Sequence, residues 1–260
     1  MSTSERVNIP LVSELIPQGI KPNTILIVEY DPDSQWFALA TTIAARFLLA
    51  NGRVGYVAFT RSPDDVRRDL SSLGVDVSSV QKEGRLTVDD WYSASLTGGR
   101  LESSGGQTSF NEPIEGGMRM RSLKVADLSV QWLRDAKYGP QPFDIVETWP
   151  PGSLSVGESF SALLRFNEER ELMEWTETRV IPIERKRKGV SLWGLVNGIH
   201  SEVYYKRLES ALDGVIDVRV TEREGETKDL LRIRSLKGQP HDHSWHEIQI
   251  KENGEAALKT

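Results

Sequence analysis

A strand, a short loop and a helix in residues 25–50 constrain this chain more than any other feature. Residues 25–28 are a continuous apolar run (ILIV), which is typical of a strand buried on both faces. From Trp36 the apolar residues recur at helical spacing, and Asn51 and Gly52 provide a helix stop. Loops in this setting bind phosphate, because backbone N–H groups and the positive end of the helix dipole attract an anion.

The loop lacks the residues that phosphate binding needs. A nucleotide-binding loop would read G-x-x-x-x-G-K-[ST] from residue 29 to residue 36. Gln35 stands where the lysine belongs and brings no charge to a phosphate, and Trp36 cannot replace the hydroxyl that ligates magnesium. Ser34 replaces a glycine, and three nearby carboxylates would repel a triphosphate. These degenerate positions are Glu29, Asp31, Asp33, Ser34, Gln35 and Trp36.

The composition favours one globular domain over residues 1–260. A net charge of -6 argues against a basic surface for nucleic acid, so we expect no nucleic-acid partner. The chain has no cysteine, which excludes disulfides and thiol catalysis and is consistent with the cytoplasm. No apolar run reaches the length of a membrane span, and the first ten residues show no signal-peptide core.

Strand and helix patterns alternate along most of the chain and then give way to strands alone. Ser62 is a good N-cap for the helix that follows the second strand, and Gly74 is its stop. This order predicts an α/β fold with a mainly parallel sheet flanked by helices and an antiparallel C-terminal β edge. Residues 97–117 are rich in glycine and serine, which predicts a flexible insertion. The expected strands are residues 25–28, 55–60, 84–91, 143–149, 178–183, 214–223, 229–236 and 246–251, and later helices are expected near residues 122–137, 158–176 and 201–212.

Two segments carry a resemblance to a known family. One is SPDDVRRDLSSLGVDV at residues 62–77, and the other is ALDGVIDVRV followed by LRIRSLKGQPHDHSWHEIQI within residues 211–250. Together with the order of the elements, they resemble the KaiC-like branch of the RecA superfamily over roughly residues 15–254. The resemblance implies a RecA-like ATPase core that often assembles as a ring, with ATP at the subunit interfaces.

Two catalytic positions implied by the resemblance are altered. Active members carry acidic residues directly after the second strand, whereas this chain has Thr60 and Arg61. A threonine and a cation cannot polarise an attacking water as a carboxylate does. Glu147, in the strand expected at residues 143–149, is the nearest match to the aspartate that holds magnesium through water.

The family also has a basic finger that reaches the γ-phosphate of a neighbouring subunit. Here Ser235 replaces its first lysine, Lys237 stands in place of an arginine, and His241 is retained. Because this edge faces the neighbour in the family, we expect Lys237, Arg232 and Arg234 to balance the loop carboxylates of an adjacent subunit.

Two further clusters have both a functional and a structural interpretation. His241, His243 and His246 are of the type that ligates metals, but without cysteine and with one nearby carboxylate we expect no metal site. The basic run at residues 185–188 suits a nucleic-acid strand, although a solvated loop is the simpler interpretation.

The combined losses predict a pseudo-ATPase, a non-catalytic protein without a cofactor. It would act through protein contacts as a regulatory or assembly subunit, in a homo-oligomer or beside paralogous RecA-like subunits. The alternative is a divergent ATP-binding protein or ATPase that uses ATP and magnesium in a rearranged site. A third reading, a DNA-associated accessory protein, depends on residues 185–188 alone.

Overall fold

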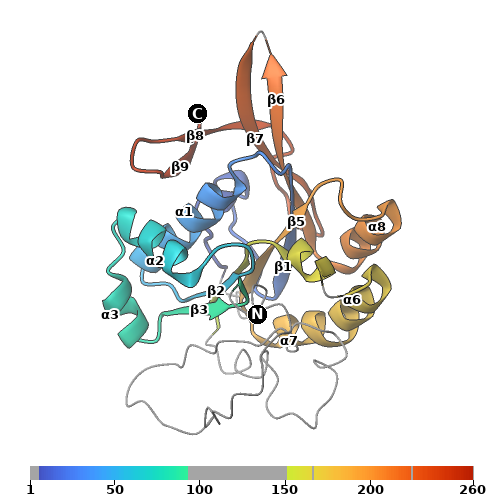
Figure 1. The fold of residues 1–260 in the computed structure, drawn as a ribbon, viewed down its shortest axis with the longest axis horizontal. Coiled ribbons are helices and arrows are strands. Elements are labelled where there is room, and N and C mark those ends of the chain that lie inside the picture. The colour runs from blue at the N-terminus through green and yellow to red at the C-terminus, as the bar shows by residue number, and fades with distance from the viewer. Residues whose placement is uncertain (1–5, 93–150, 166, 224, 260) are drawn as a thin grey trace, which may run out of the picture.

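The computed structural model describes residues 6–92, 151–165, 167–223 and 225–259. The flexible insertion expected at 97–117, the helix expected at 122–137 and the strand expected at 143–149 lie outside these residues. The described residues form a sheet of nine strands in the order β3-β2-β4-β5-β1-β6-β7-β8-β9 (Figure 1). The strands are β1 (Thr24–Tyr30), β2 (Val54–Ala58), β3 (Leu86–Asp90), β4 (Leu154–Gly157), β5 (Val190–Val196), β6 (Gly214–Arg223), β7 (Glu226–Leu236), β8 (His246–Ile250) and β9 (Ala256–Leu258).

The pairing of the strands confirms the fold class predicted from the sequence. Every pair from β3 to β6 is parallel, and the pairs β6–β7, β7–β8 and β8–β9 are antiparallel. Strand β1 lies between β5 and β6, and all seven of its residues are buried, as its continuous apolar run predicts.

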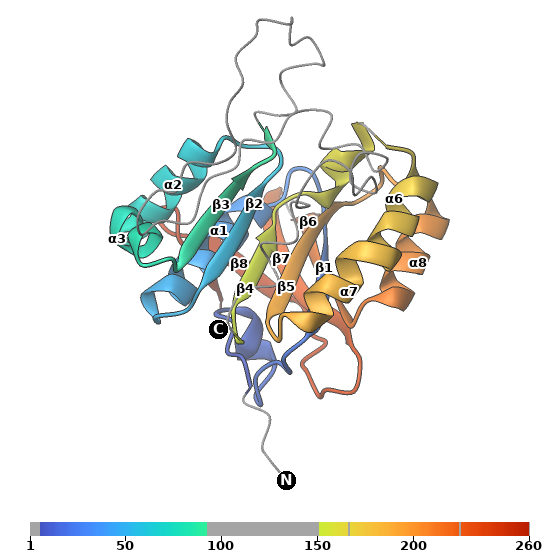
Figure 2. The same cartoon turned by 90° about the horizontal axis from the view of Figure 1, so that it is seen from below.

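Helices cover both faces of the sheet. The view in Figure 2 places α1, α2 and α3 on one side and α6, α7 and α8 on the other. Alternate residues of β1 enter the two cores: Leu26 and Val28 pack with α1, whereas Ile25 and Ile27 pack with α6 and α8. The helices are α1 (Trp36–Leu49), α2 (Pro63–Ser72), α3 (Val77–Lys82), α6 (Glu169–Trp175), α7 (Ile181–Lys186) and α8 (Glu202–Ala211), with 3₁₀ helices η1 (Val12–Leu15) and η5 (Phe160–Arg165) and a π-helical turn η6 (Thr176–Val180).

The prediction of a strand at residues 178–183 is wrong. These residues lie in η6 and α7, which continue α6 without a break. The alternating apolar residues suggested a strand, but Val180 packs into the same core as Leu172 and Trp175, one or two helical turns earlier. Pro182 directly follows the π-helical turn η6, where the regular i→i−4 hydrogen bonding is already interrupted, so its missing amide is tolerated.

The sequence reasoning missed three of the described strands, β4, β5 and β9, of which β5 is the longest. It follows the basic run directly, and six of its seven residues are buried. The basic run is not a simple solvated loop, because Arg187 is buried in an ion pair with Glu184 at 2.7 Å. Lys188, by contrast, is exposed and has a left-handed backbone with φ 54°.

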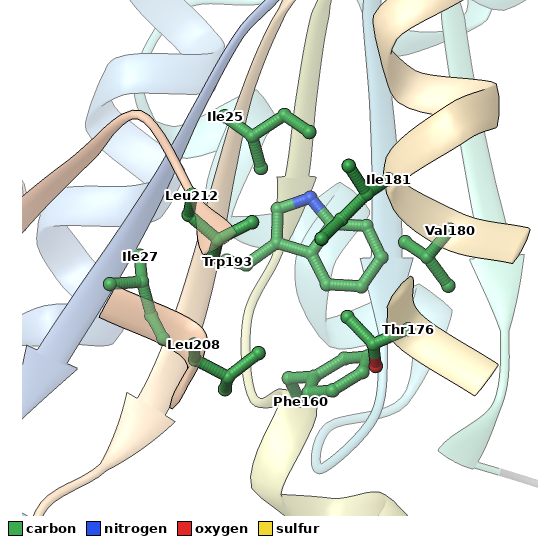
Figure 3. A pocket seen from close by; sticks show the side chains of 9 residues that line it. All are labelled: Ile25, Ile27, Phe160, Thr176, Val180, Ile181, Trp193, Leu208 and Leu212. Atoms are coloured by element: carbon green, nitrogen blue, oxygen red, sulfur yellow. The ribbon is translucent and has the colours of Figure 1, made fainter. Parts of the chain in front are cut away.

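A small gap remains in the core between the sheet and helices α7 and α8. It has a volume of about 20 Å³ and is lined by apolar side chains and Thr176 (Figure 3). A space of this size holds about one water molecule. The gap is therefore a packing defect in the core, far smaller than a ligand-binding site.

Candidate functional site

The predicted site lies at the carboxyl edge of the parallel strands. Strand β1 leads into α1 on one face of the sheet, whereas its neighbour β5 leads into α8 on the other face. In open α/β sheets, ligands bind at such a switch point, outside the carboxyl ends of the strands. The loop over residues 31–35 therefore stands where a ligand would be expected.

The β6–β7 hairpin holds this loop in place. The two carboxylate oxygens of Asp31 accept hydrogen bonds from the Val220 amide and the Asn197 side chain, each at 3.0 Å. The Asp31 amide in turn donates to the Val218 carbonyl at 3.0 Å. Asp31 is thus a structural anchor between β1, β5 and β6.

A carboxylate of the same chain occupies the anion position at the start of α1. The Gln35 amide, at the N-terminal end of this helix, donates to the Asp229 Oδ1 at 2.9 Å. Burial raises the pKa of the Asp229 carboxyl, against the opposing effect of this hydrogen bond. Ser34 is also committed, since its hydroxyl donates to the Asp31 carbonyl at 2.7 Å. Asp33 and Gln35 have exposed side chains.

Trp36 fills the place of the magnesium-binding hydroxyl with a buried ring. Its indole Nε1 donates to the Glu158 carbonyl at 2.7 Å, and the ring stacks on Tyr30 with a centroid separation of 5.9 Å. Gly194 on β5 makes room for it, because a Cβ there would lie 2.6 Å from the Trp36 Nε1. Tyr30 donates to Ser159 at 3.0 Å, and burial raises its pKa to about 12.

Glu158 is the acidic residue that the structure brings to the centre of the site. It follows β4 directly, between β2 and β5, and is fully buried. Sequence reasoning assigned this role to Glu147, which lies outside the described residues. The available signal was the short apolar segment LSVG ending in an acid, but its four residues are easily passed over.

Thr60 and Arg61, where the resemblance implies catalytic acids, bind the Glu158 carboxylate. Oε1 accepts from the amides of Phe59, Thr60 and Arg61 at 3.0, 2.7 and 3.1 Å, and from the Thr60 hydroxyl at 3.0 Å. Oε2 accepts from the Arg61 Nε at 3.1 Å and the Tyr56 hydroxyl at 3.2 Å. Both oxygens are therefore fully used within the chain.

The Arg61 guanidinium forms the cationic centre of this cluster. Its Nη1 donates to Asp69 at 2.8 Å, and its Nη2 donates to Tyr56 at 2.8 Å and to Thr41 at 3.1 Å. The group also lies 5.2 Å from the centroid of the Phe37 ring. Four of the five N–H groups of this guanidinium are used within the chain, so Arg61 holds β2, α1 and α2 together.

Glu29 is buried in a second network on the other face of β1. Arg234 lies 2.8 Å from its Oε2, and Arg219 lies 3.6 Å from the same atom. Burial raises the pKa of Glu29, and the positive charge of Arg234 opposes the rise. Asp217 is also buried and pairs with Arg232 at 2.8 Å. Arg232 and Arg234, which we expect to balance the acids of a neighbour, are paired with acids of the same chain, and the contact with a neighbour stays a prediction.

Lys237 caps the carboxyl end of α8. Its ammonium donates to the carbonyls of Ser210 at 2.6 Å and Glu209 at 3.3 Å, and to that of Leu212. Ser235 lies in β7 opposite Val215. Because β7 runs antiparallel to β6, these residues lie at the edge of the sheet opposite the loop of the same chain.

His241 makes a local hydrogen bond at the same edge. Its Nδ1 lies 2.9 Å from the Gln239 carbonyl, and its ring centroid is 4.0 Å from that of His243. Among the described residues, no three histidine, aspartate or glutamate side chains are grouped as a metal site requires.

One further cluster has the residue types of a catalytic triad. Ser161 Oγ lies 2.7 Å from His200 Nε2, and His200 Nδ1 lies 3.4 Å from Glu169. Ser161 is buried, however, and its oxygen accepts the Val196 amide at 2.9 Å. A nucleophile needs an accessible oxygen, so this cluster ties η5, α6 and β5 together as a structural unit.

Comparisons with solved structures identify proteins of similar fold. The sequence matches no protein-family model and no curated protein. Among solved structures, the KaiC-like protein PH0186 of Pyrococcus horikoshii is similar with a TM-score of 0.66 and 16% identity, covering 99% of both chains. The uncharacterized protein PH0321 of the same organism, solved in complex with an unknown peptide, has a TM-score of 0.67 and 20% identity over 93% of both chains. None of the described helices combines the length and the apolar character that crossing a bilayer requires. The sheet order, the flanking helices and these matches together show that this chain has a KaiC-like, RecA-type fold.

Proposed function

We propose that this chain is a RecA-fold protein that does not hydrolyse ATP and acts through protein contacts, as a regulatory or assembly subunit in the cytoplasm. The observation that carries the proposal is the internal use of the site: Thr60 and Arg61 bind both oxygens of Glu158. A carboxylate held in this way has no free lone pair for a magnesium-bound water. Catalysis of phosphoryl transfer depends on such positioned charges.

The start of α1 supports the same proposal. The Asp229 carboxylate accepts a hydrogen bond from the Gln35 amide, which is the kind of donor that a phosphate would need. The Trp36 ring fills the position next to it. A nucleotide would have to displace a carboxylate and a buried ring, and it would find no lysine to compensate.

A role in protein contacts is supported by the lack of catalytic groups proposed above and by one similar protein. A protein that keeps this fold without its chemistry retains surfaces for other subunits, either copies of itself or paralogous RecA-like chains. The similar protein PH0321 is described in complex with an unknown peptide, which supports a role in binding polypeptides.

A divergent ATP-binding protein is the second candidate, and Glu158 is the observation that favours it. An acid at the end of β4, beside β2 and β5, stands where magnesium would be held in an active relative. For this reading, the Arg61 side chain would have to leave Glu158 when nucleotide binds.

Calorimetric titration with ATP and magnesium, together with a phosphate-release assay, tests the proposal. We expect neither binding heat at micromolar ATP nor turnover. Magnesium-dependent turnover that Glu158→Gln abolishes and Glu252→Gln leaves intact would overturn the proposal and establish the second candidate.

A further inference from the structure

A groove lies at the amino edge of the sheet, opposite the degenerate loop. It is formed by residues that precede β1, β2, β4 and β5 and by the carboxyl end of α1. Its volume is about 820 Å³, which is within the range of binding sites for ligands and short segments. Nothing in the site described above uses it.

The groove is cationic, although the protein carries a net charge of -6. Arg6 and Lys188 line it, and no aspartate or glutamate is among its lining residues. Arg6 donates only to neutral acceptors, the Gln239 side chain at 2.8 Å and the Gly19 carbonyl at 3.4 Å. Within the described part of the chain, neither cation lies within 4.0 Å of a carboxylate. An acidic ligand would therefore meet two uncompensated charges.

Three asparagines complete the polar lining of the groove. Asn8, Asn23 and Asn51 are exposed, and in the described residues their side chains make no hydrogen bond. An asparagine amide offers both a donor and an acceptor, and thus matches the N–H and C=O groups of an extended backbone. Phe47 and Pro22 supply apolar contacts beside them.

The walls of the groove are fixed before any ligand arrives. The Asn23 amide donates to the Gly189 carbonyl at 2.7 Å, and the Gly152 amide donates to the Lys188 carbonyl at 3.0 Å. The last turn of α1 also faces the groove, where its negative dipole end would oppose an anion. Its carbonyls are already bonded, however, by the amides that follow the helix and by Arg85 at 2.9 Å. A preformed groove binds a flexible segment at a lower entropic cost.

We propose that this groove binds an extended, acidic segment of a partner protein. The inference rests on the proposed function, since it names the chemistry of one protein contact. Backbone amides of the segment would meet the three asparagines, and its carboxylates would meet Arg6 and Lys188. Nucleic acid fits the site less well, because two cations and one partly covered aromatic ring offer neither a phosphate track nor a stacking platform.

Two decapeptide libraries test the proposal, one with glutamate or aspartate at half of its positions and one with lysine or arginine there. We expect binders from the acidic library only, with affinity that falls as salt is raised. The variants Asn51→Asp and Lys188→Gln should each weaken the best binder about tenfold. Aspartate retains the size of asparagine and tolerates the φ of 63° at residue 51, so the protein should still fold, with a small loss of stability from a carboxylate at the negative end of α1. Lys82→Gln, on the exposed end of α3, changes the net charge by the same one unit and is the control that should leave binding unchanged.

The outcomes separate this inference from the proposed function. Equal selection from both libraries, no selection from either, or binders that ignore Asn51→Asp and Lys188→Gln would overturn the groove as an acidic-segment site. Phosphate release measured on the same preparations reports independently on the proposed function. ATP turnover in a sample with an intact groove would overturn that proposal and leave the peptide result standing on its own.

Discussion

At the scale of single residues, Thr60 and Arg61 determine the surroundings of Glu158. Both follow β2 directly and donate hydrogen bonds to the Glu158 carboxylate. A buried carboxylate without partners would be costly, and these donors make its burial possible. The acid at the end of β4 has thereby become a structural centre that joins β2, β4 and α2.

Removing the charge of Glu158 should strongly destabilise the fold. Among the described residues, Glu158→Gln leaves Asp69 as the one carboxylate paired with Arg61, and it turns an amide NH₂ toward groups that are themselves donors. We expect a loss of about 3 kcal/mol in the free energy of unfolding, as is typical when one partner of a buried pair is removed. Urea denaturation measures it, with the exposed Glu252→Gln as the control. Equal stability of the two variants would show that the hydrogen bonds to Glu158 contribute little.

His200 should make stability depend on pH. Burial lowers its pKa to about 4, whereas an unfolded histidine titrates near 6.5. The folded state therefore disfavours the proton: the contribution is fully present above pH 6.5 and is lost as the pH falls toward 4. Between pH 7 and pH 5 the loss should be about 2 kcal/mol relative to His200→Gln. Parallel pH profiles of the two proteins in chemical denaturation would contradict this assignment.

At the scale of elements, the β6–β7 hairpin controls the loop. The Val220 amide of the hairpin donates to the Asp31 carboxylate, and the Asp229 carboxylate accepts from the Gln35 amide. The bonded residues are 189 and 194 positions apart in the sequence. The loop is thus fixed by a late part of the chain, and its own sequence does not determine its conformation.

Freeing the start of α1 should not create an ATP site. Asp229→Ala removes the acceptor of the Gln35 amide and should cost about 1 kcal/mol in stability, as the loss of a helix cap does. The double variant Asp229→Ala with Gln35→Lys should still bind no ATP at micromolar concentration, because the buried Trp36 ring and Asp31 remain. Calorimetric titration measures this, with Glu226→Ala on the same hairpin as the control. Micromolar affinity in the double variant would mean that Asp229 alone closes the site.

The sequence predicted those elements whose pattern is local. The apolar run of β1 and the Ser62 cap of α2, where the hydroxyl accepts the Asp65 amide at 3.1 Å, are confirmed. Strand β5 was missed because it needs its parallel neighbours to define it, and residues 178–183 were taken for a strand because short apolar segments fit both periods.

The sequence shows which motif residues are absent from the loop, but it does not show which contacts its residues make. The missing lysine and hydroxyl at Gln35 and Trp36 are visible in the sequence alone. The contacts of Asp229, Arg61 and Glu158 join residues 97 to 194 positions apart, and no local pattern reports them. Glu147 was chosen because it ends the more obvious apolar segment.

At the scale of the whole molecule, the two buried carboxylates beside β1 are paired within the chain. Glu29, Asp217 and the three arginines that surround them form one network across β1, β6 and β7. Because these charges already have partners, we expect a contact between subunits to gain its energy mainly from apolar area.

Self-association of this protein should therefore be insensitive to salt. Exposed apolar side chains in the described residues include Ile199 and Val203, which flank the start of α8 and are 52% and 75% exposed. Light scattering at low and high ionic strength should give the same mass, because screening weakens exposed charge pairs but not apolar contacts. Val203→Asp should lower the mass of an oligomer that uses this face, whereas Leu49→Asp, at the far end of α1, should not. An oligomer that dissociates as salt rises would contradict the internal balance of charge. A monomer at every concentration would remove self-association and leave other proteins as the partners.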